Sequence, residues 1–444
     1  MTVILAMAGT AIGLGNIWRF PYMLGEYGGF AFVLVYVIAT ILVSLPVFIA
    51  EVIVGRRSRC NARDAFSSLA PGNKFWRVLG VLPVLIPTII ASYYSVIGGW
   101  SLEYFIKACS LTFNSLSPSD SAQMFGGFIS STWTPVILHI VFFVLCALVV
   151  VGGVRSGIER FSKYTMPVLF VLVLFIAIYS MSLPGSAAGV EYMFKPDFTK
   201  MTPRTFAYAM GQSFYSLSLG MGAIITYGSY VKKEENILAS SSGTALSDLS
   251  FALLAGLAIM PAVFAAGIEP NAGPGLIFQS IPFIFSKMSI NMPVTSAITA
   301  IMFFLAVVVA AMTSCISLIE VITAYIVERY NISRKWAVAI VTLICGGAGI
   351  ICSLSFGPLS ALTVSGKSIF DMFDWFASNI LLLSMSFLVV VFVGFVMRKE
   401  DVRDEFTNSG TISLSNKIFP VVYVLIKWVC PIAVAMIFLT NFIL

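Results

Sequence analysis

Residues 5–22 read LAMAGTAIGLGNIWRFPY, an apolar run interrupted by glycines, an asparagine and an arginine. Glycine is common in membrane-spanning helices, where it lets neighbouring helices pack closely. Close packing does not explain Asn16 or Arg19, because an arginine at the centre of a bilayer costs about 2.5 to 3.5 kcal/mol on the insertion scale. Arg19 should therefore face a wet cavity or a carboxylate. We interpret the run as an unwound helix that lines a site.

The composition of the whole chain indicates that its main solvent is lipid. Of the 444 residues, 59% are hydrophobic and 10% are charged, and the mean hydropathy of +0.97 leaves too few polar groups to cover a soluble globule. Most of the apolar segments are long enough to cross about 30 Å of hydrocarbon. The eleven segments are residues 2–24, 29–54, 78–106, 133–151, 164–183, 205–230, 237–268, 294–327, 336–354, 369–397 and 418–443. We expect an all-α polytopic membrane protein.

Basic residues gather in alternate loops between these segments. The loop around residues 56–77 holds the largest group, and others lie near residues 155–163, 232–233, 329–335 and 398–417. The positive-inside rule places these loops, and with them the N-terminus, in the cytoplasm. The net charge of +6 is therefore explained by the basic residues of the cytoplasmic loops, and it gives no reason to expect a nucleic-acid partner.

The sixth segment is interrupted in the same way as the first. Residues 211–230 read GQSFYSLSLGMGAIITYGSY, with serines and glycines in the middle. Because the two interrupted helices are offset by five spans, an odd number, the second five-span unit should be inverted relative to the first, with a binding site at the midplane between them. We expect a first repeat over residues 1–183, an inverted repeat over 184–397, and a loop with an accessory eleventh helix over 398–444.

Several motifs together resemble the neurotransmitter:sodium symporter family. They are GLGNIWRFPY at 13–22, EVIVGR at 51–56, the Tyr93-Tyr94 pair before Trp100, SLSLGMG at 216–222 and AMTS at 311–314. The similarity extends to the end of the tenth span and is that of bacterial amino-acid transporters with eleven spans. It implies a leucine-transporter-like fold, with an inverted five-plus-five helix repeat and an eleventh helix, in a bacterial inner membrane.

The resemblance also implies two sodium sites built from oxygen ligands, which a hard cation prefers. The residues that match the first site are Ala11, Asn16, Ser216 and Asp248. Those that match the second are Gly9, Ile12, Ala310, Thr313 and Ser314. Taken alone, the hydroxyls of Thr313 and Ser314 could simply bond back to their own helix.

Asp248 is notable because an ionised carboxylate inside an apolar span is by default functional. In chloride-dependent relatives an anion lies near the first sodium, whereas some bacterial members use an acidic side chain in its place. Asp248 could both bind sodium and supply that negative charge. We therefore expect two sodium ions as cofactors and no chloride.

Charge complementarity favours an amino acid as the substrate. Amides freed near Leu14 and Gly15 lie at a half-helix N-terminus and can bind a carboxylate, with the Tyr94 hydroxyl as a further donor. The pocket that the resemblance implies is mostly apolar and holds no full charge. Its residues are Thr10, Ala11, Leu14, Gly15, Ile90, Tyr94, Tyr215, Ser216, Ser218, Met221, Cys315 and Leu318. The pliable thioether of Met221 favours large hydrophobic or aromatic side chains, whereas the Tyr215 hydroxyl leaves a polar substrate open.

Gates on both sides of the pocket follow from the same resemblance. Arg19 would pair with Asp374 on the outer side, over an aromatic lid, while Tyr230 and Glu328 match the inner gate.

Several other residues within the spans can be interpreted as either structural or functional. His139 should be packed in the core rather than relay protons. Glu51 and Glu320 indicate interior hydrogen-bond networks or proton coupling. Gly157 and Pro167 fit either local unwinding of the fifth span or a simple kink.

Together, these observations predict a sodium-coupled symporter that imports neutral, hydrophobic or aromatic L-amino acids by alternating access. A proton-coupled carrier of the same fold and a non-transporting substrate sensor are the alternatives. An enzyme is not expected, because the sequence shows no HExxH motif and no pairing of a nucleophile with a base. The partners expected are the amino acid and the lipid bilayer, and a homodimer is left open.

Overall fold

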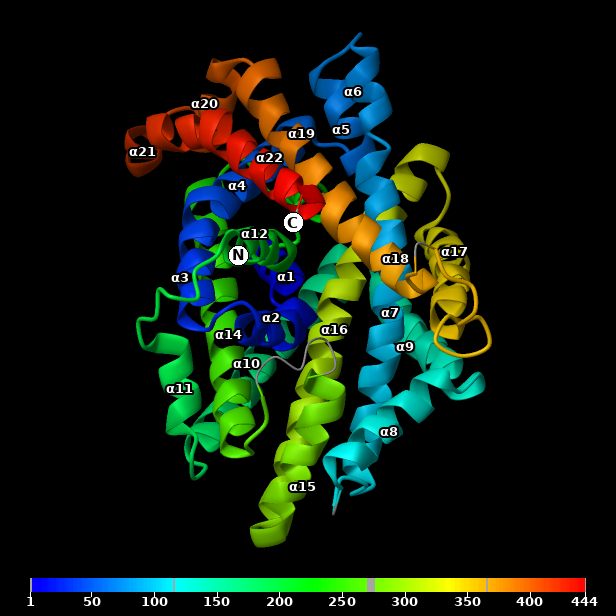
Figure 1. The fold of residues 1–444 in the computed structure, drawn as a ribbon. Helices are drawn as coiled ribbons and strands as arrows, with labels where there is room; N and C mark the ends of the chain where they lie inside the picture. The colour runs from blue at the N-terminus through cyan, green and yellow to red at the C-terminus, as the bar shows by residue number, and fades with distance from the viewer. Residues whose placement is uncertain (1, 115, 270–275, 365, 444) are drawn as a thin grey trace.

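The computed structural model describes residues 2–114, 116–269, 276–364 and 366–443, and these are almost entirely helical (Figure 1). Their single β-bridge joins Val364 to Lys367. Nine helical segments among them are long and apolar enough to cross a membrane: Phe30–Ser58, Lys74–Cys109, Trp133–Val151, Ser156–Met181, Ile237–Ala265, Pro293–Tyr330, Arg334–Leu354, Ile369–Val396 and Ser413–Thr440. They correspond to the expected spans two to five and seven to eleven.

The first expected span is broken into two short helices. Helix α1 (Thr2–Ala11) stops before residues 12–14, and a π-helical turn (Gly15–Arg19) then leads into α2 (Phe20–Glu26). The predicted interruption of this span is confirmed.

The sixth expected span is also broken, between α12 (Pro203–Ser216) and α13 (Ala223–Tyr230). Ser218, Gly220 and Gly222 there have φ angles of +54°, +73° and +73°. A right-handed helix cannot continue through left-handed backbone, and glycine adopts that backbone at little steric cost. The second predicted interruption is therefore confirmed as well.

Longer helices surround these two broken ones. They are α3 (Phe30–Ala39) with α4 (Leu45–Ser58), α7 (Leu82–Cys109), α9 (Trp133–Val151), α10 (Arg160–Met181), α14 (Ile237–Ala265), α16 (Pro293–Tyr330), α17 (Arg334–Leu354), α18 (Ile369–Phe376) with α19 (Leu382–Val391), and α21 (Ser413–Val424) with α22 (Cys430–Ile443). Helices α7 and α16 pack along each other, as do α4 with α13 and α10 with α14.

Short helices cap the two ends of the bundle. They are α5 (Ala62–Leu69), α6 (Lys74–Leu79) and α20 (Lys399–Thr407) at one end, and α8 (Pro118–Ser130), α11 (Ala187–Phe194) and α15 (Ile281–Asn291) at the other (Figure 1). The long spans run between these two ends, as they must in a membrane protein.

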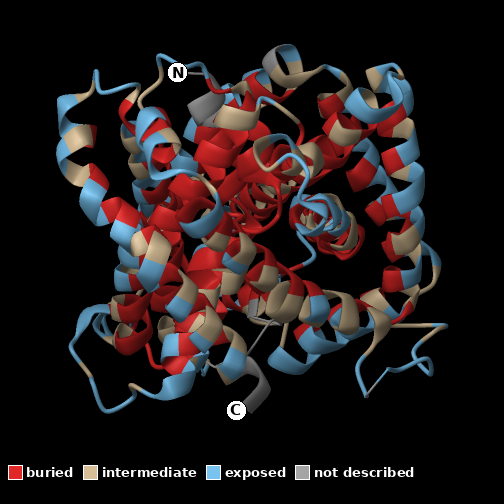
Figure 2. Cartoon of the chain, turned by 90° about the horizontal axis from the view of Figure 1, so that it is seen from above, coloured by how far each residue is buried: buried red, intermediate tan, exposed pale blue. Residues whose placement is uncertain are grey.

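The interior and the periphery of the bundle differ sharply in burial. Seen from above, buried residues gather in the middle and exposed ones on the outside (Figure 2). Large apolar side chains such as Leu148, Val171 and Leu343 are 62 to 76% exposed on the long spans. A soluble surface rarely carries so many contiguous apolar side chains, so this periphery is the face that meets lipid.

Candidate functional site

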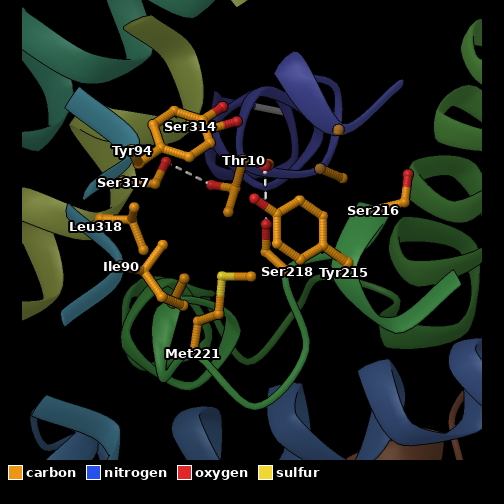
Figure 3. A pocket seen from close by; sticks show the side chains of 13 residues that line it. Thr10, Ile90, Tyr94, Tyr215, Ser216, Ser218, Met221, Ser314, Ser317 and Leu318 are labelled. Atoms are coloured by element: carbon orange, nitrogen blue, oxygen red, sulfur yellow. Dashed lines mark hydrogen bonds between the residues drawn. The ribbon is translucent and has the colours of Figure 1, made fainter. Parts of the chain in front are cut away.

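A narrow cavity of about 20 Å³ lies where the two broken helices meet α7 and α16 (Figure 3). Its lining residues are Thr10, Ala11, Gly15, Ile90, Tyr94, Tyr215, Ser216, Ser218, Met221, Ala223, Ser314, Ser317 and Leu318. All of the predicted substrate residues belong to this set except Leu14 and Cys315, which are buried without lining it. The structure thus brings together in one cavity residues that are up to 308 positions apart in the chain.

Hydroxyl groups tie the parts of this pocket together. The Thr10 and Ser317 hydroxyls lie 2.7 Å apart, and the Ser218 hydroxyl donates to the Thr10 carbonyl at 3.0 Å (Figure 3). Tyr227 donates to Ser317 at 3.2 Å. Sequence reasoning missed Ser317, although it lies one turn beyond Thr313 and Ser314 and therefore on the same face of α16.

A buried carboxylate lies beside the pocket. Asn16 Nδ2 donates to Asp248 Oδ1 at 2.7 Å and to Ser216 Oγ at 3.0 Å, and Ser216 Oγ donates to Asp248 Oδ1 at 2.8 Å. Tyr36 adds a longer bond of 3.4 Å to Asp248 Oδ2. Three of the four residues predicted for the first sodium site are therefore in direct contact, and the fourth, Ala11, lines the adjoining pocket. The sequence did not predict Tyr36, because a tyrosine whose hydroxyl contacts a site looks the same in the sequence as one that only packs in the core.

The Asn16 amide also holds the break of the first span. Its Oδ1 accepts a hydrogen bond of 3.0 Å from the backbone N–H of Gly13, while its nitrogen faces Ser216 and Asp248. On the other side of the break, Gln212 donates to the carbonyl of Gly15 at 3.0 Å. Backbone groups that the missing helical turn leaves free are thus partly satisfied by side chains, as burial requires.

The residues predicted for the second sodium site lie at the contact between this break and α16. The Thr313 hydroxyl is 2.8 Å from the carbonyl of Ala310 and 3.1 Å from that of Ile12. It therefore makes both the bond within its own helix and the bond to the broken span. A Cβ placed on Gly13 would lie only 1.9 Å from Ser314 Oγ. Gly9 packs against α10 instead, where an added Cβ would be 2.8 Å from Ser162 Oγ.

These donors suit a small hard cation. Carbonyls, hydroxyls, an amide and one carboxylate are the oxygen ligands that such a cation prefers, and unwound backbone is where transporters bind sodium. No group of three or more His, Cys, Asp or Glu side chains suited to a metal occurs in the described ranges. The oxygen donors brought together here fit the predicted sodium ion.

The predicted outer gate is arranged around an aromatic ring. The Arg19 guanidinium lies over Tyr215, 4.3 Å from the ring centroid, which is a favourable cation–π position. Asp374 accepts from Ser378 at 3.2 Å, and no ion pair joins it to Arg19 in the part of the chain that the structure describes. The Arg19–Asp374 gate remains a prediction.

At the other end of the pocket, the predicted inner-gate residues bind other partners. Tyr230 donates to Glu320 at 3.3 Å, and Glu320 forms an ion pair with Arg334. Glu328 accepts from the backbone N–H and the side-chain amide of Asn61, at 3.0 and 2.7 Å. The expected interior network around Glu320 is confirmed, and the inner-gate role of Tyr230 and Glu328 stays a prediction.

The family model of the sodium:neurotransmitter symporters matches residues 1–124 and 114–444. The chain belongs to the sodium:neurotransmitter symporter family.

Individual relatives extend this result. An uncharacterized sodium-dependent transporter of Bacillus subtilis is 36% identical over 439 residues, which cover 98% of this chain and 95% of the relative. A second one, from Haemophilus influenzae, is 36% identical over 463 residues, with coverages of 99% and 96%. The crystal structure of MhsT in complex with L-phenylalanine superposes with a TM-score of 0.90 at 38% identity, over 99% of this chain and 98% of that one.

Membership of the symporter family shows what kind of protein this is. It is a multi-pass membrane transporter of the sodium-dependent class and not an enzyme, and it has the leucine-transporter fold that the sequence predicted.

Within this symporter, two further buried polar residues support the helices. Glu51 Oε1 accepts from the N–H of Gly220 at 2.7 Å, so its carboxyl group holds the break of the sixth span. His139 Nε2 contacts the carbonyl of Gly346 at 3.0 Å, and the ring packs where a Cβ on Gly349 would meet it at 2.4 Å. The histidine is thus packed between helices, as expected.

The start of the fifth span is irregular. Gly153 has a φ angle of +84°, and a π-helical turn (Val154–Glu159) that includes Gly157 precedes α10. Pro167 lies within α10 itself. The irregular backbone is thus at Gly153, whereas Gly157 is inside the π-helical turn, and the choice between local unwinding and a kink at Pro167 stays open.

Proposed function

We propose that this symporter imports neutral, hydrophobic or aromatic L-amino acids together with sodium by alternating access. The proposal rests on one relationship: the pocket and the buried Asn16–Ser216–Asp248 cluster share Ser216. A substrate in the pocket and a cation at the cluster would therefore be adjacent, which is the arrangement that coupled binding requires.

The pocket offers complementary groups to both ends of an amino acid. The Tyr94 hydroxyl is buried at the pocket and makes only loose contacts with the Ser314 side chain and the Leu14 backbone, so it can donate to a substrate carboxylate instead. The backbone near Gly15 lies at the start of the second half of the first span, where free amides favour an anion. Carbonyls freed by the breaks can accept the ammonium group.

The walls of the pocket determine the side chain that fits. Ile90, Met221 and Leu318 are apolar, and no charged side chain is among the lining residues described. A charged substrate side chain would lose its hydration without gaining a partner, at a cost of several kcal/mol. That MhsT is bound to L-phenylalanine supports a large apolar side chain here as well.

Sodium binding at the first site would change the contacts of Asn16. A cation between Ser216 and Asp248 attracts the amide oxygen, so the amide must turn and give up its bond to the Gly13 N–H. That N–H is next to the amides that would bind the substrate carboxylate. Sodium and substrate would thereby favour each other's binding. The second sodium would bind among Gly9, Ile12, Ala310, Thr313 and Ser314.

Asp248 would replace chloride in this mechanism. Its carboxylate lies in a fully buried cluster in which no cationic side chain forms an ion pair with it, among the residues described. A sodium ion at this point would be balanced by that fixed negative charge, so no mobile anion is needed.

The positive-inside rule also supports an orientation. We propose that the end carrying α5, α6 and α20 faces the cytoplasm, and that residues 1–183 and 184–397 form the two inverted repeats, followed by the accessory segment 398–444.

Uptake into proteoliposomes tests the proposal. With an inward sodium gradient and chloride replaced by gluconate, radiolabelled phenylalanine, leucine or tryptophan should accumulate above its external concentration. Two sodium ions at a tenfold gradient and 100 mV supply about 7 kcal/mol, enough for a gradient of about 10⁵-fold. Uptake driven by a pH gradient alone would contradict sodium coupling, and binding without accumulation would indicate a sensor.

A further inference from the structure

A lysine lies within the last membrane span of the protein. Lys427 is at the middle of the segment Ser413–Thr440, in a π-helical turn (Leu425–Val429). Neither Lys427 nor Lys399 takes part in an ion pair within the described ranges. An ionisable residue inside a span is costly and usually has a specific partner, so the surroundings of Lys427 indicate what that partner is.

The Lys427 ammonium group reaches toward the end of the bundle that carries α20. Its Nζ lies 5.0 Å from the ring centroid of Phe395 and 5.8 Å from that of Tyr423, one turn earlier in its own helix. Helical side chains lean toward the N-terminus of their helix, and this span begins at the α20 end. Phe395 ends the tenth span, two residues before Met397 and the charged helix α20. The ammonium is therefore close to the level of the lipid headgroups.

A second cation lies beside the same ring. Lys399 Nζ is 5.5 Å from the Tyr423 centroid. Of the nearby acids, Asp401 is engaged by Arg57 and Arg398, and the exposed Glu400 lies within electrostatic range of Tyr423. The two ammonium groups near this ring outnumber that one exposed acid, so an external anion would be attracted to them.

Apolar rings continue this face toward the membrane interior. Phe395 and Trp428 are 49% and 55% exposed, and they pack edge to face with centroids 5.4 Å apart. Helices α19, α20, α21 and α22 lie together at this end of the molecule (Figure 1). The surface thus combines cations at headgroup level with exposed aromatic rings just below them.

We infer that the surface formed by Phe395, Lys399, Tyr423, Lys427 and Trp428 binds one anionic phospholipid. Its phosphate would bind the two ammonium groups, and its acyl chains would cover Phe395 and Trp428. Basic surfaces between spans recognise acidic headgroups in this way, at about 1 kcal/mol per lysine. A zwitterionic lipid carries its own cation and would bind less well.

Native mass spectrometry of the purified full-length protein tests this site with phosphatidylglycerol and phosphatidylcholine as probes. The protein should retain one phosphatidylglycerol in preference to phosphatidylcholine. Lys427→Met and Lys399→Gln should each weaken that retention about fivefold. Lys427→Arg keeps the charge and should keep the lipid, and Lys417→Gln, an exposed lysine of α21, should behave as the wild type.

Three results would overturn the inference. Equal retention of both lipids would mean that the surface does not distinguish an anionic headgroup from a zwitterionic one. Unchanged retention in a folded Lys427→Met variant would place the lipid elsewhere. A change in oligomeric mass on substitution, with no change in lipid retention, would show that a second copy of the chain covers this surface instead.

Discussion

The Asp248 carboxylate accepts a 2.7 Å hydrogen bond from Asn16, which lies 232 positions earlier in the chain, and both side chains are completely buried. This bond joins the break of the first span to the middle of the seventh. Ser216, at the end of α12, completes the contact. Two broken helices and one continuous helix therefore meet at a single carboxylate, so the charge on Asp248 should affect both cation binding and the shape of the pocket.

Neutralising this carboxylate should disable transport or change its anion dependence. In Asp248→Asn, the loss of hydrogen bonds to a charged group costs about 1.5 to 3 kcal/mol, so sodium-driven uptake should fall about 10- to 150-fold. Any remaining uptake should increase when chloride is added, because chloride can supply the missing charge. Uptake in sodium chloride and sodium gluconate measures both effects.

Asp404→Asn is the matched control, since Asp404 is an exposed acid on α20. It should transport as the wild type does. Full, chloride-independent uptake by Asp248→Asn would show that the carboxylate is neither a sodium ligand nor a substitute for chloride.

Adding a methyl group at Gly13 should separate the broken span from α16. The new Cβ would lie 1.9 Å from Ser314 Oγ and 3.2 Å from the Ala310 carbonyl, so the Ser314 hydroxyl must turn away and α16 must give by a few tenths of an ångström. Such overpacking costs about 1 to 3 kcal/mol, and uptake by Gly13→Ala should fall about 5- to 150-fold. Gly243→Ala in α14 meets nothing within 4 Å and should leave uptake unchanged. Equal activity of the two variants would refute a tight contact at Gly13.

The sequence predicted the broken helices because glycine and buried polar residues leave a clear signal in an apolar span. It also identified most of the residues that line the pocket, because the motifs that resemble the symporter family imply a fold in which those residues meet. It missed Tyr36, Gln212 and Ser317, whose contacts depend on which faces of distant helices meet. It could not foresee that Arg19 would lie over the Tyr215 ring, because side-chain partners near a gate depend on the conformation of the bundle.

Removing the Tyr94 hydroxyl should weaken substrate binding without destabilising the protein. That hydroxyl is buried and makes no hydrogen bond of good geometry in the described part of the chain, only loose contacts with the Ser314 side chain and the Leu14 backbone, so Tyr94→Phe should cost the folded protein little. A bond to a substrate carboxylate is worth about 1.5 to 3 kcal/mol, so KM for uptake should rise about 10- to 150-fold.

Tyr104→Phe serves as the control for Tyr94→Phe. Tyr104 is on the same helix, is equally buried and also lacks a hydroxyl partner among the described residues, but it does not line the pocket. Its KM should not change. If both variants, or neither, raised KM, Tyr94 would not be a ligand of the substrate carboxylate.

Two neighbouring arginines should differ greatly in their importance for stability. The side chain of Arg56 is 1% exposed and donates to Glu405 at 2.7 Å, to the Glu235 carbonyl at 2.8 Å and to Asn408 at 2.9 Å. Arg57 is 31% exposed, binds the partly exposed Asp401 at 2.5 Å and has a longer contact of 3.6 Å with Glu405. Removing one member of a buried ion pair costs about 3 to 5 kcal/mol, whereas an exposed pair contributes about 0 to 1 kcal/mol. Arg56→Gln should therefore lower the thermal midpoint in detergent much more than Arg57→Gln does. Equal midpoints for the two variants would show that α20 is not fixed to the second span through Arg56.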